Sequence, residues 1–216
     1  MGSDGISIET DMGLNAQSVI AELDTALGKA SKSKHAWMLC SIVDLFLRGA
    51  ESFSNDQIAI FGDVIGRLIE NLERAELAEL STKLAPIAKA PQGVIERLAS
   101  HDDIAVSGPV LAASAVLTDE ILAGLAKTKG QFHLGAIAAR SRLGESVTDH
   151  LIDRGNLDVA RKLLGNPEAR LSELGFVKLI KRSESEGELA TLIANRDDIP
   201  RELRPFLKTP AGSPSS

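Results

Sequence analysis

Hydrophobic and polar positions alternate with the period of an α-helix over most of this chain. In residues 55–72, apolar side chains such as Phe61, Ile65 and Leu68 recur every three or four positions, which is the spacing of one helix face. The residues SNDQ, at 54–57, have the spacing of a capping box, in which two side chains satisfy free amides at the start of a helix. We therefore expect an amphipathic helix here, with one face covered by the rest of the protein.

The same periodicity predicts helices through the whole central part of the chain. They are expected at residues 16–29, 35–48, 73–88, 92–100, 104–113, 118–128, 131–141, 145–154, 157–165, 172–183, 187–195 and 199–207. No segment alternates at every second position over β-branched residues, as strands do. Residues 1–14 and 209–216 are rich in Gly, Ser, Pro or acidic residues, so we expect disordered tails there. The sequence predicts an all-α protein.

A polar loop recurs between these helices. The copies are LASHDDI at 98–104, LIDRGNL at 151–157 and IANRDDI at 193–199. In each copy a short polar side chain precedes the next apolar segment, and Asp103, Asn156 and Asp198 are therefore expected to cap helices. The first two copies lie about 53 residues apart, which is twice a unit of about 26 residues. Residues 125–138 fit the unit between them, with Gly130 at the cap position.

Helical pairs that recur in this way must bury their apolar faces against neighbouring pairs, as in an α-solenoid. We expect an N-terminal helical bundle over residues 15–90 that continues into a short HEAT-like α-solenoid, an α-α superhelix, over residues 91–208. The spacing of the units becomes irregular near residue 180. The one reason that we can give is that terminal repeats are often atypical.

The motifs of the second part resemble a known bacterial family. The run APQGVIERLASHDDIAVSGPVLAAS at 90–114 is followed by LTDEILAGLA, AIAARSRLGESVTDHLIDRGN and LLGNPEARLSE. Together these stretches are similar to the bacterial domain of unknown function 2336, over roughly residues 60–207. The resemblance implies an array of short helices related to HEAT and leucine-rich-variant repeats. It implies no catalytic residue, because the activity of that family is not established.

Composition narrows the range of partners. Aromatic residues make up 3% of the chain, which contains no tyrosine, so few side chains can stack on bases or sugars. The net charge of −6 gives no basic footprint, and nucleic acid is therefore an unlikely partner.

The apolar segments favour a cytoplasmic protein. The longest apolar run, residues 36–47, is interrupted by Asp44 and is too short to span a membrane. The N-terminal residues lack the basic and then apolar pattern of a secretory signal. We expect a cytoplasmic protein with no membrane contact, in which Cys40, within this apolar run, is buried and unreactive.

The sharpest candidate for chemistry is the loop of His101, Asp102 and Asp103, because imidazole and carboxylates can bind metals or transfer protons. Consecutive residues rarely converge on one ion, however. The positions aligned with His101 and Asp103 in the second copy are Arg154 and Asn156, which suit a capped loop and not a metal site. We expect no catalytic residue, metal or cofactor and no enzymatic activity, although a small-ligand or enzymatic site at the His101 loop stays open as an alternative.

The remaining functional candidate is a surface. The cations expected to face outward on the second helices of successive units form what we call the basic stripe: Arg140, Arg161, Lys162, Arg201 and Arg204. This stripe is either a solvated face paired with nearby acidic side chains or a groove that binds an acidic protein segment. We expect a non-enzymatic module for protein-protein interaction or regulation, with an unidentified protein partner. Nucleic-acid binding through the stripe is the alternative, and a homodimer that uses helix 16–29 also stays open.

Overall fold

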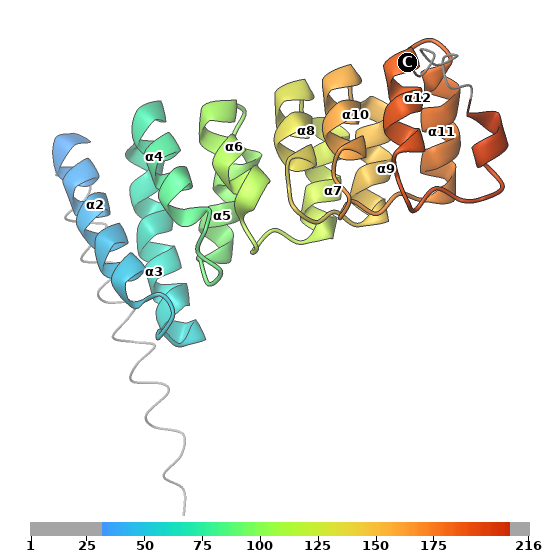
Figure 1. Cartoon of the computed structure of the whole chain (residues 1–216). Helices are drawn as coiled ribbons and strands as arrows, with labels where there is room; N and C mark the ends of the chain where they lie inside the picture. Colours follow the sequence, from blue (N-terminus) through green and yellow to red (C-terminus); the bar gives the residue numbers. More distant parts are fainter. Residues whose placement is uncertain (1–31, 208–216) are drawn as a thin grey trace, which may run out of the picture.

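The computed structural model describes residues 32–207, which form α-helices joined by short connections (Figure 1). The α-helices are α2 (Lys32–Gly49), α3 (Asn55–Leu68), α4 (Arg74–Leu84), α5 (Gln92–Ser100), α6 (Ile104–Ala113), α7 (Asp119–Thr128), α8 (Gln131–Ala138), α9 (Glu145–Arg154), α10 (Leu157–Leu164), α11 (Glu173–Ser183) and α12 (Gly187–Ala194). Two 3-10 helices, η1 (Ile69–Asn71) and η2 (Arg204–Phe206), are also present. The predicted all-α class is confirmed.

The helices stack in two layers, as in an α-solenoid. In the even layer α4, α6, α8, α10 and α12 pack on one another in unbroken order. From α5 onward, each odd-numbered helix packs on the even-numbered helix that follows it. The even layer continues past residue 90 without a break, which is where we expected the change from bundle to array.

The odd layer is interrupted between α5 and α7. Helix α3 packs on α5, α7 on α9 and α9 on α11, but α5 and α7 do not pack closely. Residues 114–118 span this interruption, and Leu117 within them is buried. The even layer therefore joins the two parts of the protein at this point, mainly through α6 and α8.

Local sequence signals explain where the helices begin. The predicted capping box is present, because Ser54 Oγ accepts a hydrogen bond from the Gln57 amide at 3.3 Å and Gln57 Oε1 accepts one from the Ser54 amide at 2.9 Å. Thr118 and Ser172 cap α7 and α11 in the same way, each through a side-chain oxygen.

The core changes in composition along the molecule. Near α2 and α3 three rings form a cluster, in which Phe61 lies 5.3 Å from Phe46 and 5.1 Å from Phe53 between ring centroids. Beyond α5 the core consists mostly of Leu, Ile, Val and Ala, for example Leu122 and Leu151. Among residues 32–207, no helix combines the length and the apolar character that a bilayer crossing requires.

Two predictions about local structure were wrong. The segment expected to be helical over 199–207 contains only η2. Cys40 is exposed, together with Trp37 and Leu45, because α2 is the first described helix and no described helix covers its outer side. An apolar sequence shows that a helix can be buried, but it does not show which of its faces lies against a neighbour. The helix predicted at 16–29, the tail at 1–14 and the tail at 209–216 fall outside the described residues.

Candidate functional site

The polar loops between the helices are mainly structural. Asp103 Oδ1 accepts a hydrogen bond from the Ala105 amide at 2.9 Å and caps α6, and Asn156 Oδ1 accepts one from the Val159 amide at 3.0 Å and caps α10. Asp198 differs from our expectation, because no described α-helix begins after it.

Asp198 instead binds the guanidinium of Arg196 through both carboxylate oxygens, at 2.7 Å each. The third copy of the loop follows α12, an even-layer helix, whereas the first two copies follow the odd-layer helices α5 and α9. This difference accounts for the slip in register near residue 180.

Each side chain of the His101 loop has a structural partner. His101 Nδ1 accepts a hydrogen bond from the Asp103 amide at 3.0 Å. Lys129 donates to Asp102 at 2.6 Å and lowers the pKa of that carboxyl. The pKa of Asp103 is lowered as well, first by the Ala105 amide and then by Arg74. Among residues 32–207, no three His, Cys, Asp or Glu side chains are grouped so that they could hold a metal ion.

The basic stripe is not a row of free cations. Arg140 is half-buried, which lowers its pKa, and it donates hydrogen bonds to the carbonyl oxygens of Leu111 and Ser114, each at 2.8 Å. Lys162 donates to the carbonyl oxygen of Gly135 at 3.3 Å.

Arg161, also in the stripe, pairs with Glu188 at 2.6 Å and with Asp158 at 2.9 Å, and the hydrogen bonds to Glu188 raise its pKa. Arg201 and Arg204 are exposed near the end of the described chain. Three of the five stripe residues therefore make contacts within the protein.

A recurring set of cations ties each unit to the one before it. We call them the carbonyl ties: Arg97, Lys129, Arg154 and Arg182 in the odd layer, and Arg140 and Arg196 in the even layer. Each donates to backbone carbonyl oxygens near the end of the helix one unit earlier in its layer. The last carbonyl groups of a helix lack the amide partners that the next turn would supply, and they carry partial negative charge.

Two examples show the geometry of the ties. Arg182 donates to the carbonyl oxygen of Gly155 at 2.7 Å, and Arg196, which is 7% exposed, donates to those of Asn166 and Ala169 at 2.8 Å each. Sequence reasoning missed this role, although the recurrence of Lys or Arg about once per unit was a visible signal.

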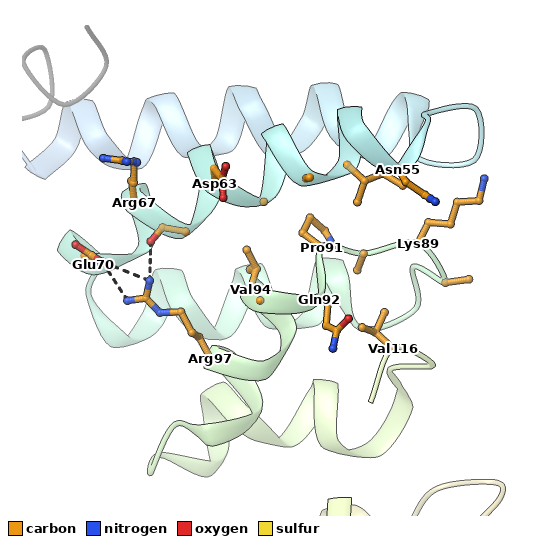
Figure 2. A pocket seen from close by; sticks show the side chains of 17 residues that line it. Asn55, Asp63, Arg67, Glu70, Lys89, Pro91, Gln92, Val94, Arg97 and Val116 are labelled. Carbon is orange, nitrogen blue, oxygen red and sulfur yellow. Dashed lines mark hydrogen bonds and ion pairs between the residues drawn. The ribbon is translucent and has the colours of Figure 1, made fainter. Parts of the chain in front are cut away.

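A groove of about 990 Å³ lies between α3 and α5, as Figure 2 shows. Its floor is made of small or apolar residues from α3, from the connection before α5, from α5 itself and from the segment 114–118. They are Ile58, Ala59, Gly62, Gly66, Ala88, Ala90, Pro91, Gly93, Val94 and Val116. Sequence reasoning did not find this groove.

Polar residues lie along the rim of the groove (Figure 2). At one end Arg97 donates to the carbonyl oxygen of Gly66 at 3.0 Å and pairs with Glu70 at 3.4 Å. At the other end Lys89 donates to the carbonyl oxygen of Glu51 at 2.9 Å. The two ends therefore differ, because Asp63 and Glu70 accompany the cations Arg67 and Arg97 at one end, whereas Lys89 contacts a carbonyl oxygen and no described carboxylate at the other.

Three glycines leave the floor of the groove without side chains at their positions. A Cβ atom at Gly62 would lie 3.0 Å from Pro91, so this glycine lets α3 approach the connection before α5. A Cβ atom at Gly66 or Gly93 would meet no atom within 4 Å, so these positions border open space. The only sequence signal was a pair of glycines inside a predicted helix, where each costs about 1 kcal/mol relative to alanine.

Comparison with known proteins finds a similarity in the second part of the chain. The model of a family described as "Uncharacterised protein conserved in bacteria (DUF2336)" matches residues 106–208. Residues 106–208, just under half of the chain, are therefore similar to this family. The DUF2336 segment begins inside α6, so α3 and α5, which form most of the groove, lie before it. No curated protein and no solved structure matches the chain significantly.

Proposed function

We propose that this chain is a non-enzymatic protein-binding module and that its partner docks in the groove between α3 and α5. The observation that carries the proposal is the apolar floor of this groove, which follows the length of α3 and is bordered by charged residues. Exposed apolar floors with a polar rim are typical of sites where proteins bind one another.

The glycines of the floor support this proposal. Gly66 lies inside α3, where a glycine destabilises the helix, and no neighbouring atom of the described structure requires its small size. A Cβ atom at Gly93 would likewise enter free space beside the groove. These two glycines leave the backbone of the groove open to close approach by a second molecule.

The chemistry of the lining favours contact over catalysis. Among the residues that line the groove there is no His, Cys, Ser or Thr, and Arg97 pairs with one of the two carboxylates, that of Glu70. Arg140, Lys162 and Arg161 of the basic stripe make contacts within the protein, which weakens the case for nucleic-acid binding along the stripe. We place the module in the cytoplasm, as an adaptor or regulator.

The proposal is tested by filling the groove without disturbing the fold. Gly66→Leu and Gly93→Leu each place a side chain in open space, and Gly124→Leu does the same on the exposed surface of α7, away from the groove. The full-length protein and these variants serve as baits in affinity capture from native cells, followed by quantitative mass spectrometry. Thermal unfolding of each bait confirms that it is folded.

We expect a protein that is captured by the wild type and by Gly124→Leu but lost with either filled-groove variant. A partner retained by all four baits would bind elsewhere and would contradict the assignment of the groove. If no protein is captured by any bait, the proposal that this chain is a protein-binding module is itself wrong.

A further inference from the structure

We infer that the bound segment of the partner is an amphipathic α-helix of about fifteen residues whose acidic side chains lie at the Lys89 end of the groove; this inference rests on the proposed function. The groove is elongated, because its lining follows α3 from Asn55 to Glu70. At a rise of about 1.5 Å per residue, these positions span about 22 Å. A helix about as long as α3 would contact the whole floor, whereas one small molecule would contact only part of it.

Other ways of binding a peptide do not suit this groove. An extended peptide usually pairs with the free edge of a sheet, but α3 and α5 form the walls, and their backbone hydrogen bonds are made within each helix. A polyproline segment is usually held by an aromatic-lined groove, and none of the residues that line this one is aromatic. A helix that lies with its apolar face in the groove needs neither of these features.

Charge gives the bound helix a direction. Lys89 is exposed, and its ammonium contacts a carbonyl oxygen and no described carboxylate. Helix α5 begins close to it in sequence at Gln92, and its capping position is Pro91, which offers no side-chain acceptor for the first amides. Both features make this end of the groove electropositive.

At the opposite end the lining includes two cations, Arg67 and Arg97, and two carboxylates, Asp63 and Glu70, so the formal charges balance there, and Arg97 pairs with Glu70. Acidic residues of the partner are therefore favoured at the Lys89 end. The carboxyl end of a helix also carries partial negative charge, so the partner helix runs antiparallel to α3, which begins at Asn55 at the Lys89 end.

The test uses random peptides of about 16 residues displayed on phage, a length that spans the groove as a helix. They are selected on the full-length protein in the presence of excess soluble Gly66→Leu variant, which removes peptides that bind elsewhere. We expect the recovered peptides to share apolar or small residues at intervals of three and four positions, with Asp or Glu concentrated in the last turn. Gly93→Leu serves as a second competitor in case Gly66→Leu does not fold.

The polarity is tested with one recovered peptide and the charge reversal Lys89→Glu. We expect Lys89→Glu to weaken the affinity for this peptide about tenfold. A second peptide, in which the acidic residues are changed to Lys, should bind the Lys89→Glu variant with the original affinity. Lys127→Glu, on the exposed surface of α7, is the matched control and leaves binding unchanged.

Several results would overturn the inference. Groove-dependent peptides with alternating or proline-rich patterns would exclude a helix, and equal effects of Lys89→Glu and Lys127→Glu would exclude the assigned direction. In both cases the protein-binding function would stand, because the capture experiment tests it separately. If no peptide is recovered that the filled-groove variant fails to bind, the groove is not a peptide site and the inference is wrong.

Discussion

The region around α2 to α5 and the array from α7 to α12 are built from the same kind of element but are stabilised differently. In the array the helices are 8 to 11 residues long, and carbonyl ties join one unit to the next. Around α2 and α3 the helices are 18 and 14 residues long, and the core contains a cluster of three phenylalanines. The groove lies in the region of α2 to α5, next to the interruption of the odd layer between α5 and α7.

This difference shows where a function should be sought in a repeated structure. A polar residue that recurs at the same position of each unit, such as Arg154 or Arg182, has a partner in the neighbouring unit and is explained by the fold. The groove, in contrast, lies between α3 and α5, beside the interruption in the odd layer. Recurrence therefore indicates architecture here, and departure from it indicates a binding surface.

The largest effect is expected in the aromatic cluster. Phe46 is fully buried and lies within 6.2 Å of the ring centroids of Phe53 and Phe61. We expect Phe46→Ala to lower the free energy of unfolding by about 3–5 kcal/mol, because it leaves a cavity between two rings. Urea unfolding followed by circular dichroism measures this change. Phe206→Ala, at an exposed ring, is the control, and equal losses in the two variants would contradict the role of the cluster.

A somewhat smaller effect is expected in the array. Arg196→Met keeps much of the side-chain volume but removes the arginine donor from the carbonyl oxygen of Ala169 and one of the two donors to that of Asn166. We expect the free energy of unfolding to fall by about 3 kcal/mol. Arg201→Met is the matched control at an exposed arginine, where we expect almost no change. If both variants unfold at the same urea concentration, the carbonyl ties do not stabilise the array.

The smallest effect is expected at Asp103, which pairs with Arg74. The pKa of this carboxyl is lower in the folded protein than in the unfolded chain, so its contribution to stability is present above about pH 4 and is lost as the pH falls through the folded value. Asn is an equally good helix cap but does not titrate. We therefore expect the melting temperature of Asp103→Asn to fall less steeply than that of the wild type on going from about pH 5 to about pH 3.

Asp197→Asn, at an exposed position of the last loop, is the control for this pH dependence. Its melting temperature should follow that of the wild type. A wild-type slope in Asp103→Asn would show that the interactions of the Asp103 carboxylate with the Ala105 amide and with Arg74 have no effect on acid stability.

Much of the fold could be predicted because helix boundaries are set locally. The helices expected at 92–100, 104–113 and 145–154 have the predicted bounds, since apolar periodicity and capping residues act within a few positions of each other. The contacts between helices could not be predicted in the same way. Arg140 was assigned to an outward face, but the chain turns after α8 and its side chain reaches back to α6.

The groove could not be predicted because it depends on the distance between two helices. Gly62 and Gly66 are both visible in the sequence, yet Gly62 faces Pro91 closely while Gly66 faces open space. Only the relative placement of α3 and α5 separates these two roles. The position of Cys40 was missed for a related reason, since burial of a residue on α2 depends on which helices surround it.

The carbonyl ties also limit how the length of this protein can change. A tie joins positions one unit apart, as Arg182 and Gly155 are separated by 27 residues. An insertion or deletion of one whole unit leaves a cation opposite each set of carbonyl oxygens, but a change of any other length inside a helix separates them. The array can therefore vary its length only in whole steps, and shorter changes are confined to the connections between helices.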